Sequence, residues 1–306
     1  MSAEFAPEDC RVGLAGYGEV GQILAEDLRA RGVARVAAFD IKLDTDTGAS
    51  LREHAQRCGV VLTASHAELA SGADLVLSAV TASQTVAVAE AIAPAIDRGT
   101  WFLDFNSASP GAKKRAAALI DGNGGRFVEA AVMTSIPPYR IRVPMLLGGA
   151  HAEAIKPVLN GLGFATKVAS SELGVASATK MCRSVMIKGL EAMVIESFTA
   201  ARAYGVEDAV LASLEETFPG IDWEKQGAYF FQRVIQHGRR RAEEMREAAA
   251  TVREIGLEPF SAAGTAKRQA FMADLAESGA FRDLKAPRED WRVDADRLLA
   301  AVARKN

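Results

Sequence analysis

The chain has 306 residues, of which 49% are hydrophobic and 25% charged, and its formal net charge at pH 7 is −3. This composition is typical of a soluble globular protein that is long enough for two domains. The charge shows no basic excess, which argues against a nucleic-acid partner. The sequence contains no run of about 20 apolar residues, so we expect no membrane span.

The cysteines and the first ten residues bear on where the protein works. Cys10, Cys58 and Cys182 form no C-x-x-C pair, and no His/Cys/Asp cluster has the spacing of a metal site. The opening MSAEFAPEDC is acidic and lacks the apolar core of a signal peptide. We therefore expect reduced thiols, a cytoplasmic location and no bound metal.

Short apolar segments alternate with helical patterns through the first half of the chain. The segments of strand length lie at 11–16, 34–40, 59–63, 73–80, 100–105, 126–132, 143–149 and 164–169. The main helical patterns between them lie at 19–32, 83–96, 109–120 and 151–162. Strands separated by helices predict an α/β domain with a doubly wound, mostly parallel sheet.

A glycine-rich turn follows the first expected strand. In RVGLAGYGEVG, Gly16, Gly18 and Gly21 form a G-x-G-x-x-G pattern that opens the helix at 19–32. The first glycine permits the tight turn, the second lets the backbone approach a pyrophosphate, and the third lets helix and sheet pack closely. The helix N-terminus favours the negative charge of the phosphates. We therefore expect a dinucleotide-binding Rossmann domain whose turn contacts the cofactor through Gly16, Tyr17, Gly18, Glu19 and Val20.

An acidic residue ends the second expected strand. Asp40 lies about 20 residues beyond the glycines, where a carboxylate accepts hydrogen bonds from the adenosine ribose and repels a 2′-phosphate. Asp40 therefore favours NAD over NADP as the cofactor. The nearby Lys42 weakens this preference, unless it is an ordinary solvated lysine.

The second half of the chain has helical patterns only. They lie at 174–206, 206–218, 223–256, 259–279 and 294–306, and Gly189 is the one interruption of the first. We expect a dinucleotide-binding domain at 1–170 and an all-α domain for substrate binding and dimerisation at 171–306. Long apolar helices of this kind often pack against a second subunit, so we expect a homodimer or a higher homo-oligomer.

Three segments resemble the β-hydroxyacid dehydrogenase family, the relatives of 3-hydroxyisobutyrate and 6-phosphogluconate dehydrogenases. FLDFNSASPG resembles the family's D-x-S-T-x-x-P segment, and FVEAAVMTS resembles its substrate segment, D-A-P-V-S-G-G. GVASATKMCRS resembles the G-x(5)-K-x-x-N-N helix, which makes Lys180 the match to the catalytic lysine. Arg183 and Ser184 replace the two asparagines. The C-terminal HGRRRAEEMREAAATVREIGLEP instead resembles a subfamily with a distinct helical domain.

The resemblance implies a role for Lys180 that its chemistry allows. Burial in a stretch of small and apolar residues would lower the pKa of the lysine toward neutrality. A neutral amine can take a proton from a substrate hydroxyl while hydride leaves the same carbon for nicotinamide. Without the resemblance, a solvated helix lysine is the ordinary interpretation.

Further residues are expected beside the cofactor. Asn106 follows the fifth expected strand, where ligands bind in such sheets, and is expected to contact the nicotinamide or its ribose. Thr81 follows the fourth strand and is expected either to line the cofactor pocket or to cap the next helix.

The expected substrate contacts come from both halves of the chain. Thr134 and Ser135 match the family's substrate segment, although they also suit a turn before two prolines. Arg183 and Ser184 lie beside Lys180 on one helix, and the arginine would pair with a substrate carboxylate or with a neighbour such as Glu191. His237 would reach the site, in the same subunit or a partner, but the charged run after it indicates a solvated helix face.

The function that follows is NAD(P)-dependent hydride transfer between a hydroxy substrate, a small molecule, and nicotinamide. Two alternatives remain open. An imine reductase of the same architecture usually lacks the lysine and favours NADPH, so Lys180 and Asp40 argue against it. A non-catalytic dinucleotide-sensing protein is compatible with the two replaced asparagines.

Overall fold

The computed structural model describes residues 7–282 and 288–304, and the chain forms two compact units, Met1–Met181 and Cys182–Asn306. The first six residues of the acidic opening and the last two of the final helical segment lie outside the described residues. The division between the units falls within a long helix, later in the chain than the boundary expected after residue 170. No described helix is both long and apolar enough to cross a membrane.

The first unit is built on one twisted sheet, whose described strands follow the order β3-β2-β1-β4-β5-β6-β7-β8. Every neighbouring pair is parallel except β6 with β7. The predicted doubly wound, mostly parallel sheet is therefore confirmed. The strands are β1 Arg11–Ala15, β2 Arg35–Phe39, β3 Val61–Leu62, β4 Leu75–Ser78, β5 Trp101–Asp104, β6 Arg126–Val132, β7 Pro144–Gly148 and β8 Ala165–Ser170.

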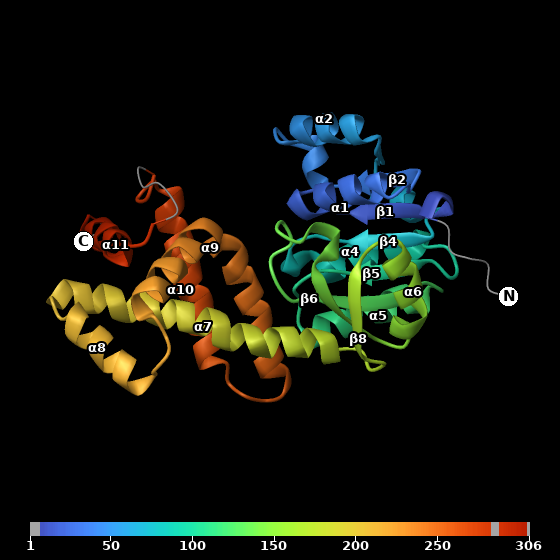
Figure 1. The fold of residues 1–306 in the computed structure, drawn as a ribbon. Helices are drawn as coiled ribbons and strands as arrows, with labels where there is room; N and C mark the ends of the chain where they lie inside the picture. The colour runs from blue at the N-terminus through green and yellow to red at the C-terminus, as the bar shows by residue number, and fades with distance from the viewer. Residues whose placement is uncertain (1–6, 283–287, 305–306) are drawn as a thin grey trace. The chain divides into compact units, whose positions relative to one another are not determined.

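Helices cover both faces of this sheet, as Figure 1 shows. Leu75 and Leu77 of β4 face a core shared with α1, α2 and α6, whereas Val76 faces a core shared with α3, α4 and α5. Alternate residues of a strand point to opposite faces, so a strand covered on both sides is apolar throughout. The helices are α1 Glu19–Ala30, α2 Gly48–Cys58, α3 His66–Ala70, α4 Thr85–Ile92, α5 Pro110–Gly122 and α6 Ala152–Gly161.

The second unit is helical around an aromatic core. Phe198, Phe231 and Trp291 are almost completely buried there, with Met272 against them. Gly189 does not interrupt the long helix that carries it. The helices are α7 Val175–Tyr204, which begins in the first unit, α8 Glu207–Thr217, α9 Trp223–Glu254, α10 Phe260–Glu277 and α11 Trp291–Ala303.

The charged run on α9 is only partly solvated, so the expectation of a solvated face is wrong for two of its residues. Arg241 is 3% exposed and pairs with Glu191 of α7, and Glu244 accepts a hydrogen bond from Lys188 at 2.5 Å. The i,i+4 pattern identified charged neighbours on α9 but not the opposite charges that α7 presents to them. Burial lowers the pKa of Lys188, while Glu244 opposes that shift.

Candidate active site

The glycine turn joins β1 to α1, and the space around Gly16 and Gly21 leaves no room for a side chain. Gly16 has φ +98°, and a Cβ there would lie 2.5 Å from the Ala79 carbonyl oxygen. A Cβ on Gly21 would lie 2.2 Å from the Gly16 oxygen, so α1 could not approach the turn. A Cβ on Gly18 would meet nothing within 4 Å, and Gly18 provides no side-chain cap for α1. Because Gly18 has no side chain, the space beside the first N–H groups of α1 stays open.

Asp40 connects the end of β2 to this turn. Its two oxygens accept the N–H of Tyr17 at 2.8 Å and the N–H of Lys42 at 2.9 Å. A carboxylate has about four acceptor positions, so two remain for a ligand. The Lys42 side chain is exposed. The half-buried carboxylate of Asp40 therefore lies against the glycine turn, where the sequence placed the ribose contact.

Asn106 ties together the loops that follow β4 and β5. Its Oδ1 accepts the N–H of Val80 at 2.8 Å, and its Nδ2 donates to Ser78 Oγ at 3.0 Å. Val80 in turn lies next to the position that a Cβ on Gly16 would occupy. The buried amide of Asn106 thus holds the β5 loop against the glycine turn. Thr81 is exposed and does not cap the following 3-10 helix with its side chain.

The loop after β5 also rests on a buried ion pair that the sequence did not reveal. Asp104 accepts the N–H of Asn106 at 2.9 Å, and Lys113 Nζ lies 3.0 Å from Asp104 Oδ2. The side chain of Lys113 is 2% exposed and that of Asp104 is 1% exposed, so both are almost completely buried. Burial raises the pKa of Asp104, and the Lys113 charge opposes that shift.

Lys180 meets this loop from the first turns of α7. Its Nζ donates to Ser107 Oγ at 2.6 Å, and its side chain is half-buried. Ser107 directly follows Asn106, so the amine belongs to the same edge of the sheet as the glycine turn. The structure therefore brings Lys180 into contact with FLDFNSASPG, another of the segments that resemble the β-hydroxyacid dehydrogenase family.

The start of α7 is fixed by Glu129, which the sequence analysis missed. This residue of β6 is fully buried, and its carboxylate accepts the N–H groups of Gly174, Ala176 and Ser177 at 2.8, 3.1 and 3.2 Å. A negative group at a helix N-terminus is favourable because it pairs with the free N–H groups and the dipole. A single carboxylate inside the otherwise apolar stretch FVEAAV was the signal that could have identified it.

The expected substrate residues are divided between the two units. Thr134 is exposed and Ser135 half-buried, directly after β6 in the first unit. Arg183, Ser184 and His237 belong to the second unit, where Arg183 is exposed, Ser184 buried and His237 half-buried. His237 borders a shallow depression between α9 and α10 that Arg239 and Glu277 also line.

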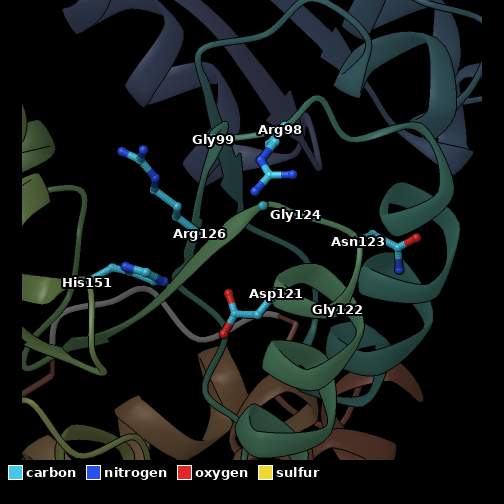
Figure 2. A pocket seen from close by; sticks show the side chains of 9 residues that line it. Arg98, Gly99, Asp121, Gly122, Asn123, Gly124, Arg126 and His151 are labelled. Carbon is cyan, nitrogen blue, oxygen red and sulfur yellow. The ribbon is translucent and has the colours of Figure 1, made fainter.

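A larger depression lies in the first unit, at the opposite edge of the sheet from Thr134 and Ser135. Figure 2 shows Arg98, Asp121, Arg126 and His151 around it. Its lining comes from the segments that precede β5 and β6, at the amino ends of the strands. Ligands of doubly wound sheets bind at the carboxyl ends, so this depression is not the expected cofactor site.

Residues 11–170 match the NAD binding domain of 6-phosphogluconate dehydrogenase. The chain belongs to this family. Residues 201–272 match a second family, described as a domain of unknown function (DUF1932). The resemblance that the glycine turn and the Lys180 segment suggested is therefore confirmed, including a C-terminal region of a separate type.

Three relatives are similar over most of this chain, and the descriptions of two of them refer to hydroxyacid dehydrogenases. A conserved hypothetical protein from Sinorhizobium meliloti is 37% identical, with 95% of this chain and 96% of that one covered and a TM-score of 0.75. The conserved protein MTH1747, described as similar to 3-hydroxyacid dehydrogenases, is 33% identical, with 88% and 98% covered and a TM-score of 0.67. Mitochondrial 3-hydroxyisobutyrate dehydrogenase of Drosophila melanogaster is 26% identical over 69% of this chain and 64% of its own length, less than two thirds.

More distant structures share the fold alone. They include a 3-hydroxyisobutyrate dehydrogenase of Mycobacterium tuberculosis, 17% identical with a TM-score of 0.64, and an imine reductase of Myxococcus stipitatus, 16% identical with a TM-score of 0.52. The chain thus has an NAD(P)-binding domain and the fold of the hydroxyacid dehydrogenases.

Proposed function

We propose that this chain is an NAD(P)-dependent oxidoreductase acting on a CH–OH group of a small hydroxy substrate, with Lys180 as the acid and base. The contact that carries this proposal is the 2.6 Å hydrogen bond from Lys180 Nζ to Ser107 Oγ. It places an amine at the carboxyl edge of the sheet, joined through Asn106 and Val80 to the glycine turn. A dehydrogenase needs a proton acceptor at that edge, beside the redox carbon.

The residues around the turn fit a dinucleotide. The open position at Gly18 leaves room for a pyrophosphate against the first turn of α1, and Asp40 keeps acceptor positions for ribose hydroxyls. When bound, the dinucleotide supplies the nicotinamide that accepts or returns the hydride. Tyr17, Glu19 and Val20 provide the backbone that would surround the phosphates.

The charge of Asp40 favours NAD over NADP. A 2′-phosphate on the adenosine ribose would meet a carboxylate that is already held in place by two backbone N–H groups. The exposed Lys42 lies two residues away and offers partial compensation. The repulsion by Asp40 outweighs the compensation by Lys42, because the Asp40 carboxylate is fixed and cannot turn away from a 2′-phosphate. The site therefore favours NAD.

Lys180 is proposed to move the proton. In its neutral form the amine accepts the proton of the substrate hydroxyl, and in the reverse direction the ammonium returns it. The hydroxyl of Ser107 holds the amine at the end of β5 and orients it toward the loop that Asn106 secures. Ser107 is therefore a positioning residue in this scheme.

Five polar residues are the proposed substrate contacts. Thr134 and Ser135 offer hydroxyls after β6, the strand next to β5 in the sheet. Arg183 offers an exposed guanidinium for a carboxylate, and Ser184 and His237 are further proposed contacts.

We also propose a cytoplasmic homodimer formed through the helical unit. Met186, Met193 and Tyr229 are 74%, 62% and 52% exposed on α7 and α9, and a second copy would cover this apolar surface. The three cysteines are free thiols, which fits a reducing compartment.

The decisive experiment measures turnover and cofactor binding in the same preparations. Lys180→Ala should lower kcat by about 10²- to 10⁴-fold on a panel of hydroxyacids, alcohols and aldehydes, while NADH fluorescence titrations remain unchanged. Lys167→Ala, which removes an exposed lysine of β8, is the matched control and should retain activity. A drop of less than tenfold would remove Lys180 from proton transfer.

The same preparations separate the alternatives. Tight NADH binding without turnover of any hydroxyacid, alcohol or aldehyde would favour a dinucleotide-sensing protein. Reduction of cyclic imines with NADPH, in the absence of alcohol oxidation, would favour an imine reductase. The retained Lys180 argues against the second outcome.

A further inference from the structure

Three potential metal ligands meet between α1 and α2, outside the proposed proton-transfer site. One donor atom each from Glu26, His54 and Cys58 lies within 4.8 Å of the others. His54 Nε2 is 3.0 Å from Glu26 Oε1 and 3.7 Å from Cys58 Sγ. A single ring nitrogen thus faces both a carboxylate and a thiol.

These separations are close to those in a zinc site. Zinc binds nitrogen and oxygen at about 2.0–2.2 Å and sulfur at about 2.3 Å, so tetrahedral ligands lie about 3.4 Å (N to O) and 3.6 Å (N to S) apart. The observed 3.0 and 3.7 Å differ from these values by a few tenths of an ångström. For the third pair, Glu26 and Cys58, the donor atoms lie within 4.8 Å of each other, so the ion would be admitted by rotation of these two side chains.

The atoms that face away from the cluster are held by further hydrogen bonds. Tyr17 OH lies 2.8 Å from His54 Nδ1, and Arg140 Nη2 lies 2.7 Å from Glu26 Oε2. Arg140 also pairs with Asp27, although its φ of +54° is uncommon for a residue with a side chain. Metal sites characteristically fix the second ring nitrogen and the second carboxylate oxygen of their ligands in this way.

We propose that Glu26, His54 and Cys58 bind one Zn²⁺ ion, with water in the fourth position. The ligand set selects zinc over magnesium or calcium because it contains a thiolate and an imidazole. His54 is 6% exposed and Glu26 40% exposed, so the site is anchored inside and open on the carboxylate side. The site joins α1, α2 and, through Tyr17, the glycine turn. It does not depend on the proposed catalytic activity.

The spacing of residues along the chain did not indicate this site. His54 and Cys58 are one helical turn apart on α2, which is a usable pair, but Glu26 lies 28 residues earlier. Only the packing of α2 beside α1 brings the third ligand to them. The expectation of no metal site rested on spacing alone.

The test measures zinc in the purified full chain without any nucleotide. The protein is equilibrated with Zn²⁺, dialysed against metal-free buffer and analysed by mass spectrometry for metal content, and a chromophoric chelator gives the dissociation constant. We expect about one zinc ion per chain. Cys58→Ser and Glu26→Gln should each weaken the affinity by more than about 100-fold, since second-layer changes alone cost 10–100-fold.

Two controls make the result specific. Cys182→Ser removes an exposed thiol of the other unit and should bind zinc as the unchanged chain does. Substitution with Co²⁺ should produce a thiolate charge-transfer band in the near ultraviolet that disappears in Cys58→Ser but persists in Cys182→Ser. Circular dichroism of the metal-free proteins confirms that each variant is folded.

Two results would overturn the site. One is a folded, unchanged chain that retains no zinc after dialysis, and the other is zinc whose affinity and cobalt spectrum are insensitive to both Cys58→Ser and Glu26→Gln. Because the measurement contains no dinucleotide or substrate, failure here leaves the dehydrogenase proposal standing, and failure of the dehydrogenase proposal leaves this result standing.

Discussion

The buried carboxylate of Glu129 accepts the backbone N–H of Gly174 at 2.8 Å, and this contact fixes where α7 begins. Ala176 and Ser177 donate to the same carboxylate. Lys180 lies in the next turn of that helix, so its reach to Ser107 depends on β6 as well as on α7. The fit is tight, because a Cβ on Gly148 would lie 2.3 Å from Glu129 Oε1.

Glu129→Gln should destabilise the protein and misplace the lysine. The neutral amide presents an NH₂ group to backbone N–H donors, which leaves buried donors unpaired, so the free energy of unfolding should fall by about 1–3 kcal/mol. Urea denaturation measures this change, and kcat should fall because Lys180 loses its position. Glu153→Gln, at an exposed glutamate in the first turn of α6, is the control. Equal stabilities of the two variants would contradict the capping role.

Asp40→Ser should narrow the preference for NAD over NADP. The change removes a fixed charge and one or two charged hydrogen bonds to the ribose, each with a value of about 1.5–3 kcal/mol. The ratio of kcat/KM for the two cofactors, or of their dissociation constants, measures the effect. Asp46→Ser, at an exposed aspartate of the following loop, should leave the ratio as it is. An unchanged ratio in Asp40→Ser would exclude the ribose contact.

Tyr17→Phe should weaken zinc binding without removing a ligand. The phenol is completely buried and its oxygen contacts His54 Nδ1, so the variant leaves the imidazole without its second partner. We expect a 10–100-fold loss of zinc affinity, roughly the effect of removing a second-layer partner. Unchanged affinity in a folded variant would mean that Tyr17 does not orient His54.

Cys10 should make the stability fall at alkaline pH. Burial, assisted by the Asp74 charge, raises the pKa of its thiol from 9.0 to about 11. Below pH 9 the thiol keeps its proton in both the folded and the unfolded chain, so the free energy of unfolding is not reduced. Between pH 9 and pH 11 only the unfolded chain releases the proton, and this lowers the free energy of unfolding. The free energy of unfolding should therefore fall by about 1–2 kcal/mol more than in Cys10→Ala, measured by urea denaturation across this range. Parallel pH profiles would contradict the raised pKa.

Elements with a strong local pattern were predicted well. The strands covered on both faces, such as β4 and β5, are continuous apolar runs, and α7 to α10 have long helical patterns. The helix α2 was not predicted, because GASLREHAQRC is mostly polar and buries little more than Leu51, His54 and Ala55. Its weak pattern also hid His54 and Cys58, which carry the proposed zinc site.

Local sequence patterns did not predict contacts between residues that lie far apart in the chain. The charges of Arg241 and Glu244 looked solvated on α9, since their pattern does not reveal that α7 buries them against Glu191 and Lys188. Asn106 was expected to contact the cofactor, and its side chain in the structure holds the β4 and β5 loops together. A local pattern identifies the type of residue that a site needs, but it does not show which residue that side chain contacts in the folded protein.

The sequence by itself determined the glycine turn, the acidic end of β2 and the lysine on α7. The spacing of the turn is a local requirement, since Gly16 has φ +98° and a Cβ on Gly21 would lie 2.2 Å from the Gly16 oxygen. Only the tertiary structure decided that Lys180 meets Ser107, 73 residues away, and that Glu26 meets His54, 28 residues away. Strand order and helix packing set those meetings, because they decide which distant segments share an edge of the sheet.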